Sequence, residues 1–324
     1  MATFLTGAAF GAAMLASGFQ NPSVIISQLK FENWHMIQAF LTATATSAIV
    51  YSVADRLGYI NLKPRSSSPI GIFSQFDGNI VGGGLLGAGM AISGACPGTL
   101  LTQVAAGFET GLYAVGGAVL GGIVWTGFLG RAIKRRNQCK NIKPETHTMD
   151  EGLGISKTAT SILFQAVCAT MVVVTTLYTE PAPEPRILGA VGGLLIGGAQ
   201  LFSIVTRRSM MGVSGSYEEA GNYIWWALGV NPRPGHGNMV FASGLLAGAW
   251  ALAKCVPELV SGPGPDIDPL LAVLGSTVMI IGSRMAGGCT SGHGISGMSM
   301  LSVSSLVTIG TAFAVGSAVV PLIH

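Results

Sequence analysis

The sequence predicts an all-α polytopic membrane protein with two pseudo-symmetric repeats, whose short, broken helices meet at a central passage that contains cysteines. Only 10% of the residues are charged, against about 25% in an ordinary soluble domain. Several runs without a single Asp, Glu, Lys or Arg approach or exceed the roughly 20 apolar residues that a membrane-spanning helix needs. These runs are 1–29, 79–108, 110–130, 158–179, 187–206, 234–253 and 285–324.

The first repeat is expected to cover residues 1–130. Its opening helix, 3–19, is as long as a full span and lacks a basic leader, so we interpret it as retained rather than as a cleaved signal peptide. Asn21-Pro22 introduces a short segment, and a second helix follows at 36–54. A polar connection at 55–76 then leads to an apolar segment at 78–107, which is interrupted at Cys96-Pro97-Gly98. A further span is expected at 112–130.

The connection 131–156 is the most polar stretch and contains six basic residues in its first half: Arg131, Lys134, Arg135, Arg136, Lys140 and Lys143. By the positive-inside rule this loop is expected to face the cytoplasm. The second repeat, 157–324, is then expected to hold helices at 157–178, 187–206 and 239–255, with a Gly-, Ser- and aromatic-rich connection before the last. A second broken segment at 269–300 and a final span at 302–322 complete it.

Glycine accounts for 47 of 324 residues, about twice its ordinary share. Small residues let helix backbones approach closely in lipid, where packing drives association. Three pairs spaced four apart are predicted to be helix-packing faces: Gly7 and Gly11, Gly117 and Gly121, and Gly193 and Gly197.

Two cysteines occupy equivalent interruptions in the two halves. Aligning Cys96 with Cys289 also superposes three pairs of glycines: Gly82 with Gly275, Gly89 with Gly282, and Gly94 with Gly287. Interrupted hydrophobic segments at corresponding positions of two halves are the best sequence pointer to a transport site. Whether the two repeats are parallel or inverted depends on how many membrane crossings separate them, and the sequence pattern does not fix this number. We expect the repeats to be inverted.

The residues at the breaks suit a small anion that carries sulfur. Pro97 disfavours a helical conformation at Cys96, and Thr99 is expected to cap a short helix over 99–107. Thr290, Ser291 or His293 is expected to lead into a second helix at 295–307. Free N–H groups at such helix starts attract anions, and a thiol adds a soft, weakly donating group.

The glycine-cysteine segments resemble the YeeE/YedE sulfur-transport family. The similarity rests on the stretches 82–89, 94–99 and 282–294, the last containing GGCTSGHG, and on Ser17-Gly18-Phe19 followed by Asn21-Pro22. It extends over nearly the whole chain. The resemblance implies thiosulfate uptake by an hourglass-shaped helical bundle in which Cys96 and Cys289 are the central cysteines. Some members have a further cysteine near the N-terminus, whereas no cysteine precedes Cys96 here.

The expected function is therefore transmembrane transport of thiosulfate or a related sulfur anion through a narrow path with thiol contacts. The chain is expected to lie in the plasma membrane and not to be an enzyme. The partners are the anion, the lipid bilayer and, by resemblance, a cytosolic rhodanese-like sulfur acceptor; no nucleic acid, metal or cofactor is expected. The predicted substrate-binding residues are Cys96, Cys289, Gly94, Pro97, Gly98, Thr99, Gly287, Gly288, Thr290, Ser291, His293 and Arg284.

Several alternatives stay open at this level. Arg284 either attracts a dianion or pairs with an acid or carbonyl groups. His293 either donates to substrate or serves as a capping side chain. Two other functions compete with transport by thiol contacts: a membrane sulfurtransferase or redox protein that uses Cys96 and Cys289, and an anion channel in which these cysteines are structural.

Overall fold

The structure, a computed structural model, describes residues 1–179, 187–260, 262 and 264–324. Within this part the chain is helical and contains no β-strand. The α-helices are α1 Ala2–Ala16, α2 Pro22–Leu29, α3 His35–Arg56, α4 Asp77–Ser93, α5 Thr99–Ala106, α6 Glu109–Val124, α7 Gly130–Cys139, α8 Met149–Leu153, α9 Lys157–Tyr178, α10 Gly189–Arg207, α11 Ser214–Ala227, α12 Gly237–Cys255, α13 Pro269–Met285 and α14 Val303–Ile323.

Six helical stretches in the described part are long and apolar enough to cross a membrane: His35–Arg56, Glu109–Cys139, Lys157–Tyr178, Gly189–Arg207, Gly237–Cys255 and Val303–Ile323. The apolar helices α1 and α13 are shorter. The prediction of an all-α polytopic protein is confirmed, and the chain is a multi-pass integral membrane protein.

The helix boundaries differ from the prediction in two connections. The span expected to end at residue 130 continues through a π-helical turn, Trp125–Leu129, into α7, so the first third of the basic connection is helical. The stretch after α10, expected to be irregular, contains α11. Its buried positions, which include Tyr217 and Gly221, face the protein and explain why a segment with two glutamates forms a helix there.

Glycines set the crossing of α4 and α13. A Cβ on Gly82 would lie 2.6 Å from the carbonyl oxygen of Gly282, and a Cβ on Gly89 would lie 2.5 Å from that of Gly275. The partner position therefore falls along α13 as the position rises along α4, which makes the two helices antiparallel. Gly82 thus meets Gly282, which is the sequence equivalent of Gly89, and Gly89 meets Gly275, which is the sequence equivalent of Gly82.

The same reciprocity extends to the surrounding helices. α4 packs on α14 while α13 packs on α6, and α1 packs on α12 while α10 packs on α3. Each predicted glycine pair lies in one of these interfaces: Gly7 and Gly11 approach the α12 backbone, Gly117 and Gly121 approach α13, and Gly193 and Gly197 approach α3. The predicted packing faces are confirmed.

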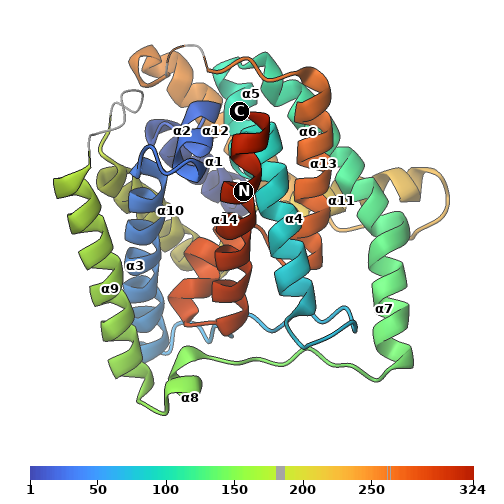
Figure 1. The fold of residues 1–324 in the computed structure, drawn as a ribbon, viewed down its shortest axis with the longest axis horizontal. Helices are drawn as coiled ribbons and strands as arrows, with labels where there is room; N and C mark the ends of the chain where they lie inside the picture. The colour runs from blue at the N-terminus through green and yellow to red at the C-terminus, as the bar shows by residue number, and fades with distance from the viewer. Residues whose placement is uncertain (180–186, 261, 263) are drawn as a thin grey trace.

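One end of the bundle is basic. In Figure 1, α7, α8, the end of α3 and the start of α4 all lie at the lower edge, whereas α5 and the C-terminus lie at the upper edge. The connection before α4 is tied to the basic stretch, since Ser67 N donates to Glu145 O at 2.7 Å and Asn137 Nδ2 donates to Pro69 O at 2.6 Å. We call this lower edge the basic end.

Candidate functional site

Both predicted breaks are present and share their backbone geometry. α4 ends at Gly94 with a φ of +59°, and α13 is followed by Gly287 with a φ of +85°. Only glycine adopts such angles at little cost. Each of these glycines stands two residues before its cysteine, so the chain turns in the same way before Cys96 and before Cys289.

The Cys96 break is held by its own polar groups. The backbone N–H of Cys96 donates to Thr99 Oγ1 at 2.7 Å, and Gln103 Nε2 donates to Gly94 O at 3.1 Å. The short helix expected after the break is confirmed as α5. Thr99 does not cap it from the preceding position, because Gly98 is the N-cap and the Thr99 hydroxyl instead bonds back to Cys96.

The Cys289 break is less regular. The helix expected at 295–307 is wrong: a π-helical turn, Ser291–Gly297, and a 3₁₀ turn, Met298–Met300, precede α14. The Cys289 thiol lies 3.2 Å from Ser291 Oγ. The seven-residue π turn contains three glycines, which weaken a regular α-helix there.

His293 is a structural residue in this arrangement. Its Nε2 donates to Ala286 O at 3.0 Å, and its Nδ1 accepts from Ser305 Oγ at 2.9 Å. A carbonyl oxygen only accepts, so the proton is on Nε2. Both ring nitrogens are engaged and 1% of its surface is exposed, so His293 ties the break to α14.

The two breaks come together around Tyr217. This α11 side chain lies close to both thiols and donates from its hydroxyl to Pro97 O at 2.9 Å. The Cys96 thiol also lies beside Thr290, the residue after Cys289. Both cysteines are free and buried, with 2% and 1% of their surfaces exposed. Thr290 Oγ1 makes no hydrogen bond of ordinary geometry within the described residues.

A cavity of about 280 Å³ is lined by Cys289 and by Arg65, which belongs to the connection at the basic end. Backbone of Gly287, Gly288 and Gly292 forms one wall, and the segment from Met210 to Gly215 forms another. Side chains of Arg65, Glu218, Asn238 and Arg284 complete the lining. Most of the exposed lining is therefore polar, which suits an ion more than an apolar ligand.

Apolar side chains pack against the glycine that precedes Cys96. A Cβ on Gly94 would lie 2.6 Å from Ile267 Cδ1 and 3.0 Å from Pro22 Cβ. Ile267 belongs to the connection before α13, just as Arg65 belongs to the connection before α4. An apolar side chain thus covers one break and a cation covers the other.

Arg65 is the functional candidate that the sequence analysis missed. Its Nη1 donates to Gly287 O at 2.9 Å. A Cβ on Gly288 would lie 2.8 Å from Arg65 Nη1, and one on Gly292 would lie 2.9 Å from Nη2. The guanidinium therefore rests on a surface that only glycines leave open. Its Nε is buried without a partner in the described part of the chain. The sequence feature that could have identified Arg65 is its position in the polar connection just before the first broken segment.

Arg284, in contrast, is paired. Its Nη2 forms an ion pair with Glu218, and its Nη1 lies 3.4 Å from Ser214 Oγ. The ion pair neutralises its charge. Among the cations that line the cavity, Arg65 has no carboxylate partner within the described residues and so supplies the net positive charge next to Cys289.

Asp77 holds the connection that carries Arg65. Its carboxylate accepts backbone hydrogen bonds from Ile70 at 2.6 Å, Ile72 at 2.6 Å, Gly78 at 2.8 Å and Phe73 at 3.3 Å. Nearby, Ser68 Oγ donates to Ala286 O at 2.9 Å. The connection is therefore fixed at α4 and against the Cys289 break.

Asp77→Ala is expected to lower the stability of the protein by about 2–3 kcal/mol, because buried N–H groups lose their acceptors. Thermal unfolding in detergent, followed by tryptophan fluorescence, measures the change. Asp55→Ala is the matched control, since Asp55 is exposed and forms no ion pair within the described residues. Equal unfolding temperatures for the two variants would contradict the anchoring role of Asp77.

Comparison with known proteins gives a family model and a curated relative that match most of the chain. The family model described as Sulphur transport matches residues 16–319. A curated relative from Spirochaeta thermophila, named thiosulfate transporter TsuA, is 23% identical over 315 residues, which cover 93% of this chain and 92% of the relative. Both matches extend across the two breaks and the cavity.

Proposed function

This chain belongs to the Sulphur transport family (YeeE/YedE), and on that premise we propose that it carries thiosulfate across the plasma membrane. One observation supports this proposal above the others. Two buried, free thiols converge on Tyr217, and one of them lines a polar cavity together with Arg65, which has no carboxylate partner within the described residues. The relative named thiosulfate transporter has nearly the same length.

Residues 1–130 and 157–324 are the two repeats in this proposal, and they are inverted. The antiparallel crossing of α4 and α13 at equivalent glycines supports the inversion. A site at the interface of inverted repeats lies near the membrane midplane. The basic connection then faces the cytoplasm, and the cavity beside Cys289 opens on that side.

The residues match the chemistry of thiosulfate. The ion has three oxygens at one end and a soft terminal sulfur at the other. The forked guanidinium of Arg65 suits the oxygens, and the S–H groups of Cys289 and Cys96 are weak donors to the sulfur. Burying a dianion is costly. Contacts must offset this cost while remaining weak enough for release, which weak thiol contacts provide without a covalent bond.

The breaks supply the remaining contacts in this proposal. Backbone around the first break, Gly94 and Pro97 to Thr99, and around the second, Gly287 to Ser291, borders the path. A cytosolic rhodanese-like acceptor that takes the delivered sulfur is part of the same proposal, and the family resemblance supports it.

Uptake of labelled thiosulfate into proteoliposomes tests the function. We expect saturable uptake that a tenfold excess of unlabelled thiosulfate removes and that the same excess of sulfate leaves largely intact. Sulfate matches thiosulfate in charge but lacks the terminal sulfur, so it isolates recognition of sulfur. A folded protein without saturable uptake, or with equal inhibition by both ions, would overturn the proposal.

Arg65→Gln is expected to reduce thiosulfate uptake about tenfold or more at low concentration, since hydrogen bonds to a charged group contribute about 1.5–3 kcal/mol. Arg65→Lys keeps the charge but loses the fork, and we expect partial activity. Lys63→Gln removes a charge two residues away and is the control. Uptake that falls equally in Arg65→Gln and Lys63→Gln would indicate a general charge effect instead of a contact with the ion.

A further inference from the structure

A second cavity, of about 340 Å³, lies between the last turns of α3 and the first turns of α9. It includes no residue of the two cysteine breaks. Figure 1 places both helix ends at the basic end of the bundle. Because α3 and α9 are both candidate membrane spans, their ends mark the level where the bilayer interior meets the headgroups.

The helix α9 packs loosely on the rest of the bundle. Its buried residues are Thr160, Cys168 and Thr175, which form one narrow stripe toward α3. Only 11% of its most apolar window is buried. Most of its surface must therefore contact lipid, and the opening between α9 and α3 is accessible to a lipid molecule.

The charged residues of this cavity stand at its aqueous side, and two exposed isoleucines lie deeper. On α3, Arg56 stands at the aqueous side and Ile49 lies two turns deeper. On α9, Lys157 stands at the aqueous side, Ile162 lies deeper, and Gln165, which donates to Ser161 Oγ at 3.2 Å, lies deeper still. Ile49 and Ile162 are 52% and 64% exposed within the protein alone. Charged groups at the aqueous side and exposed isoleucines deeper in the cavity match the headgroup and the acyl chains of a phospholipid.

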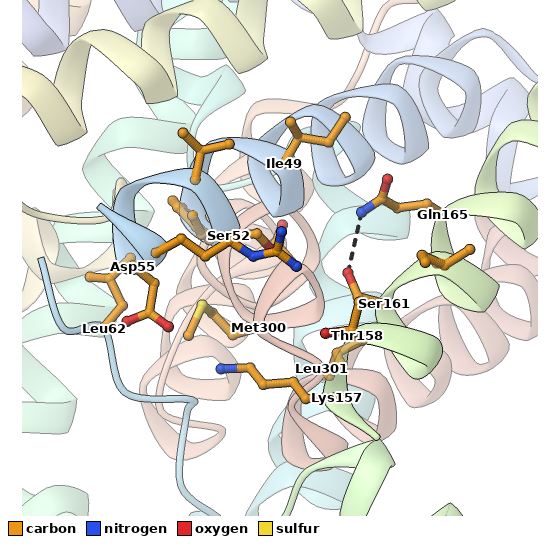
Figure 2. A pocket seen from close by; sticks show the side chains of 15 residues that line it. Ile49, Ser52, Asp55, Leu62, Lys157, Thr158, Ser161, Gln165, Met300 and Leu301 are labelled. Atoms are coloured by element: carbon orange, nitrogen blue, oxygen red, sulfur yellow. Dashed lines mark hydrogen bonds between the residues drawn. The ribbon is translucent and has the colours of Figure 1, made fainter. Parts of the chain in front are cut away.

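Two cations, Arg56 and Lys157, and one carboxylate, Asp55, stand at the rim. Figure 2 shows the Lys157 side chain in the cavity below Met300, with its amine directed toward the side where Asp55 lies. Neither Arg56 nor Lys157 forms an ion pair within the described residues. With one aspartate against two cations, the rim has a net positive charge. Hydroxyl groups of Ser52 and Thr158 add hydrogen-bond donors.

We propose that this cavity binds an anionic phospholipid of the cytoplasmic leaflet. The phosphate lies between Arg56 and Lys157, and the acyl chains follow the exposed surfaces of Ile49 and Ile162. Anionic lipids of that leaflet attract basic residues at the membrane surface. The bound lipid fills the space between α9 and α3 and contacts both helices. Without it, α9 packs on α3 only along the stripe of Thr160, Cys168 and Thr175.

Binding of phosphatidylglycerol to the purified, delipidated protein in detergent, measured by native mass spectrometry, tests this site. Arg56→Gln combined with Lys157→Gln is expected to weaken binding roughly 25-fold, about fivefold for each cation lost. The control combines Lys134→Gln with Arg135→Gln, which removes the same charge from α7 at the same end of the bundle. The control is expected to bind as the native protein does.

Two further probes separate the sources of the anionic group. Phosphatidylcholine with the same acyl chains is expected to bind at least fivefold more weakly than phosphatidylglycerol, and inorganic phosphate is expected not to bind measurably. Ser161→Phe fills the cavity without changing a charge and is expected to weaken phosphatidylglycerol binding as well. Equal binding by the two double variants, equal binding of both lipids, or binding of phosphate as strong as that of lipid would each overturn the proposal.

Discussion

Thiosulfate uptake is expected to fall at least about tenfold, a change of about 1.4 kcal/mol, when Cys289 is replaced by alanine. Cys289 provides the thiol of the polar cavity, and the methionines that also line this cavity have no S–H group to donate. Cys96→Ala is expected to have a similar effect, because in the proposed path the anion also contacts this second thiol, which lies next to Tyr217. Uptake into proteoliposomes, normalised to folded protein, measures both losses.

Cys289→Ser separates the need for sulfur from the need for a donor. A serine hydroxyl donates more strongly than a thiol but is harder and less polarizable. We expect uptake below that of the native protein and a smaller preference for thiosulfate over sulfate. A serine variant with native rate and native preference would show that any small donor suffices.

Cys168→Ala provides the matched control for these variants. Cys168 is equally buried but lies on α9, away from both breaks, and we expect its replacement to leave uptake unchanged. If Cys289→Ala and Cys96→Ala also retained native uptake, the cysteines would be structural and the anion-channel hypothesis would replace ours. Intact-protein mass spectrometry after exposure to thiosulfate is expected to show no added sulfur, whereas a persulfide would indicate covalent transfer.

The second large effect concerns stability. Gly89→Ala is expected to lower the stability of the protein by about 2–3 kcal/mol, because the new methyl group would lie 2.5 Å from backbone atoms of Gly275 and Met279. Backbone atoms cannot turn aside as a flexible side chain can, so α4 and α13 must separate. Both helices lead into the breaks, and uptake per folded molecule is expected to fall with stability.

Gly116→Ala is the control for this prediction. Gly116 lies within α6. Apart from its chain neighbours and the backbone of its own helix, no atom of the described residues lies within 4 Å of the added Cβ. Alanine forms helix better than glycine by about 1 kcal/mol, so this variant is expected to match or exceed the native unfolding temperature. A Gly89→Ala protein that unfolds at or above the temperature of Gly116→Ala would contradict the close crossing.

The arrangement at the two breaks was predictable to different degrees. Glycine at 94 and proline at 97 interrupt a helix by local sterics alone, and α5 begins where the sequence predicts. After Cys289 the sequence has glycines but no proline, and the expected helix at 295–307 gives way to a π turn. That turn depends on tertiary contacts, among them the hydrogen bond from Ser296 Oγ to Met211 O at 3.0 Å.

The sequence by itself determined the membrane spans, the interruptions at Cys96 and Cys289, and the glycine faces that let helices approach. These features follow from hydropathy, helix length and local backbone sterics, each of which is encoded within a few neighbouring residues. Only the tertiary structure decided the partners at the site. In the structure Arg284 forms an ion pair with Glu218, and both ring nitrogens of His293 form hydrogen bonds within the protein. The Arg65 guanidinium contacts Gly287 and Gly288. Such contacts join residues far apart in the chain, so their geometry is fixed by the packing of whole helices.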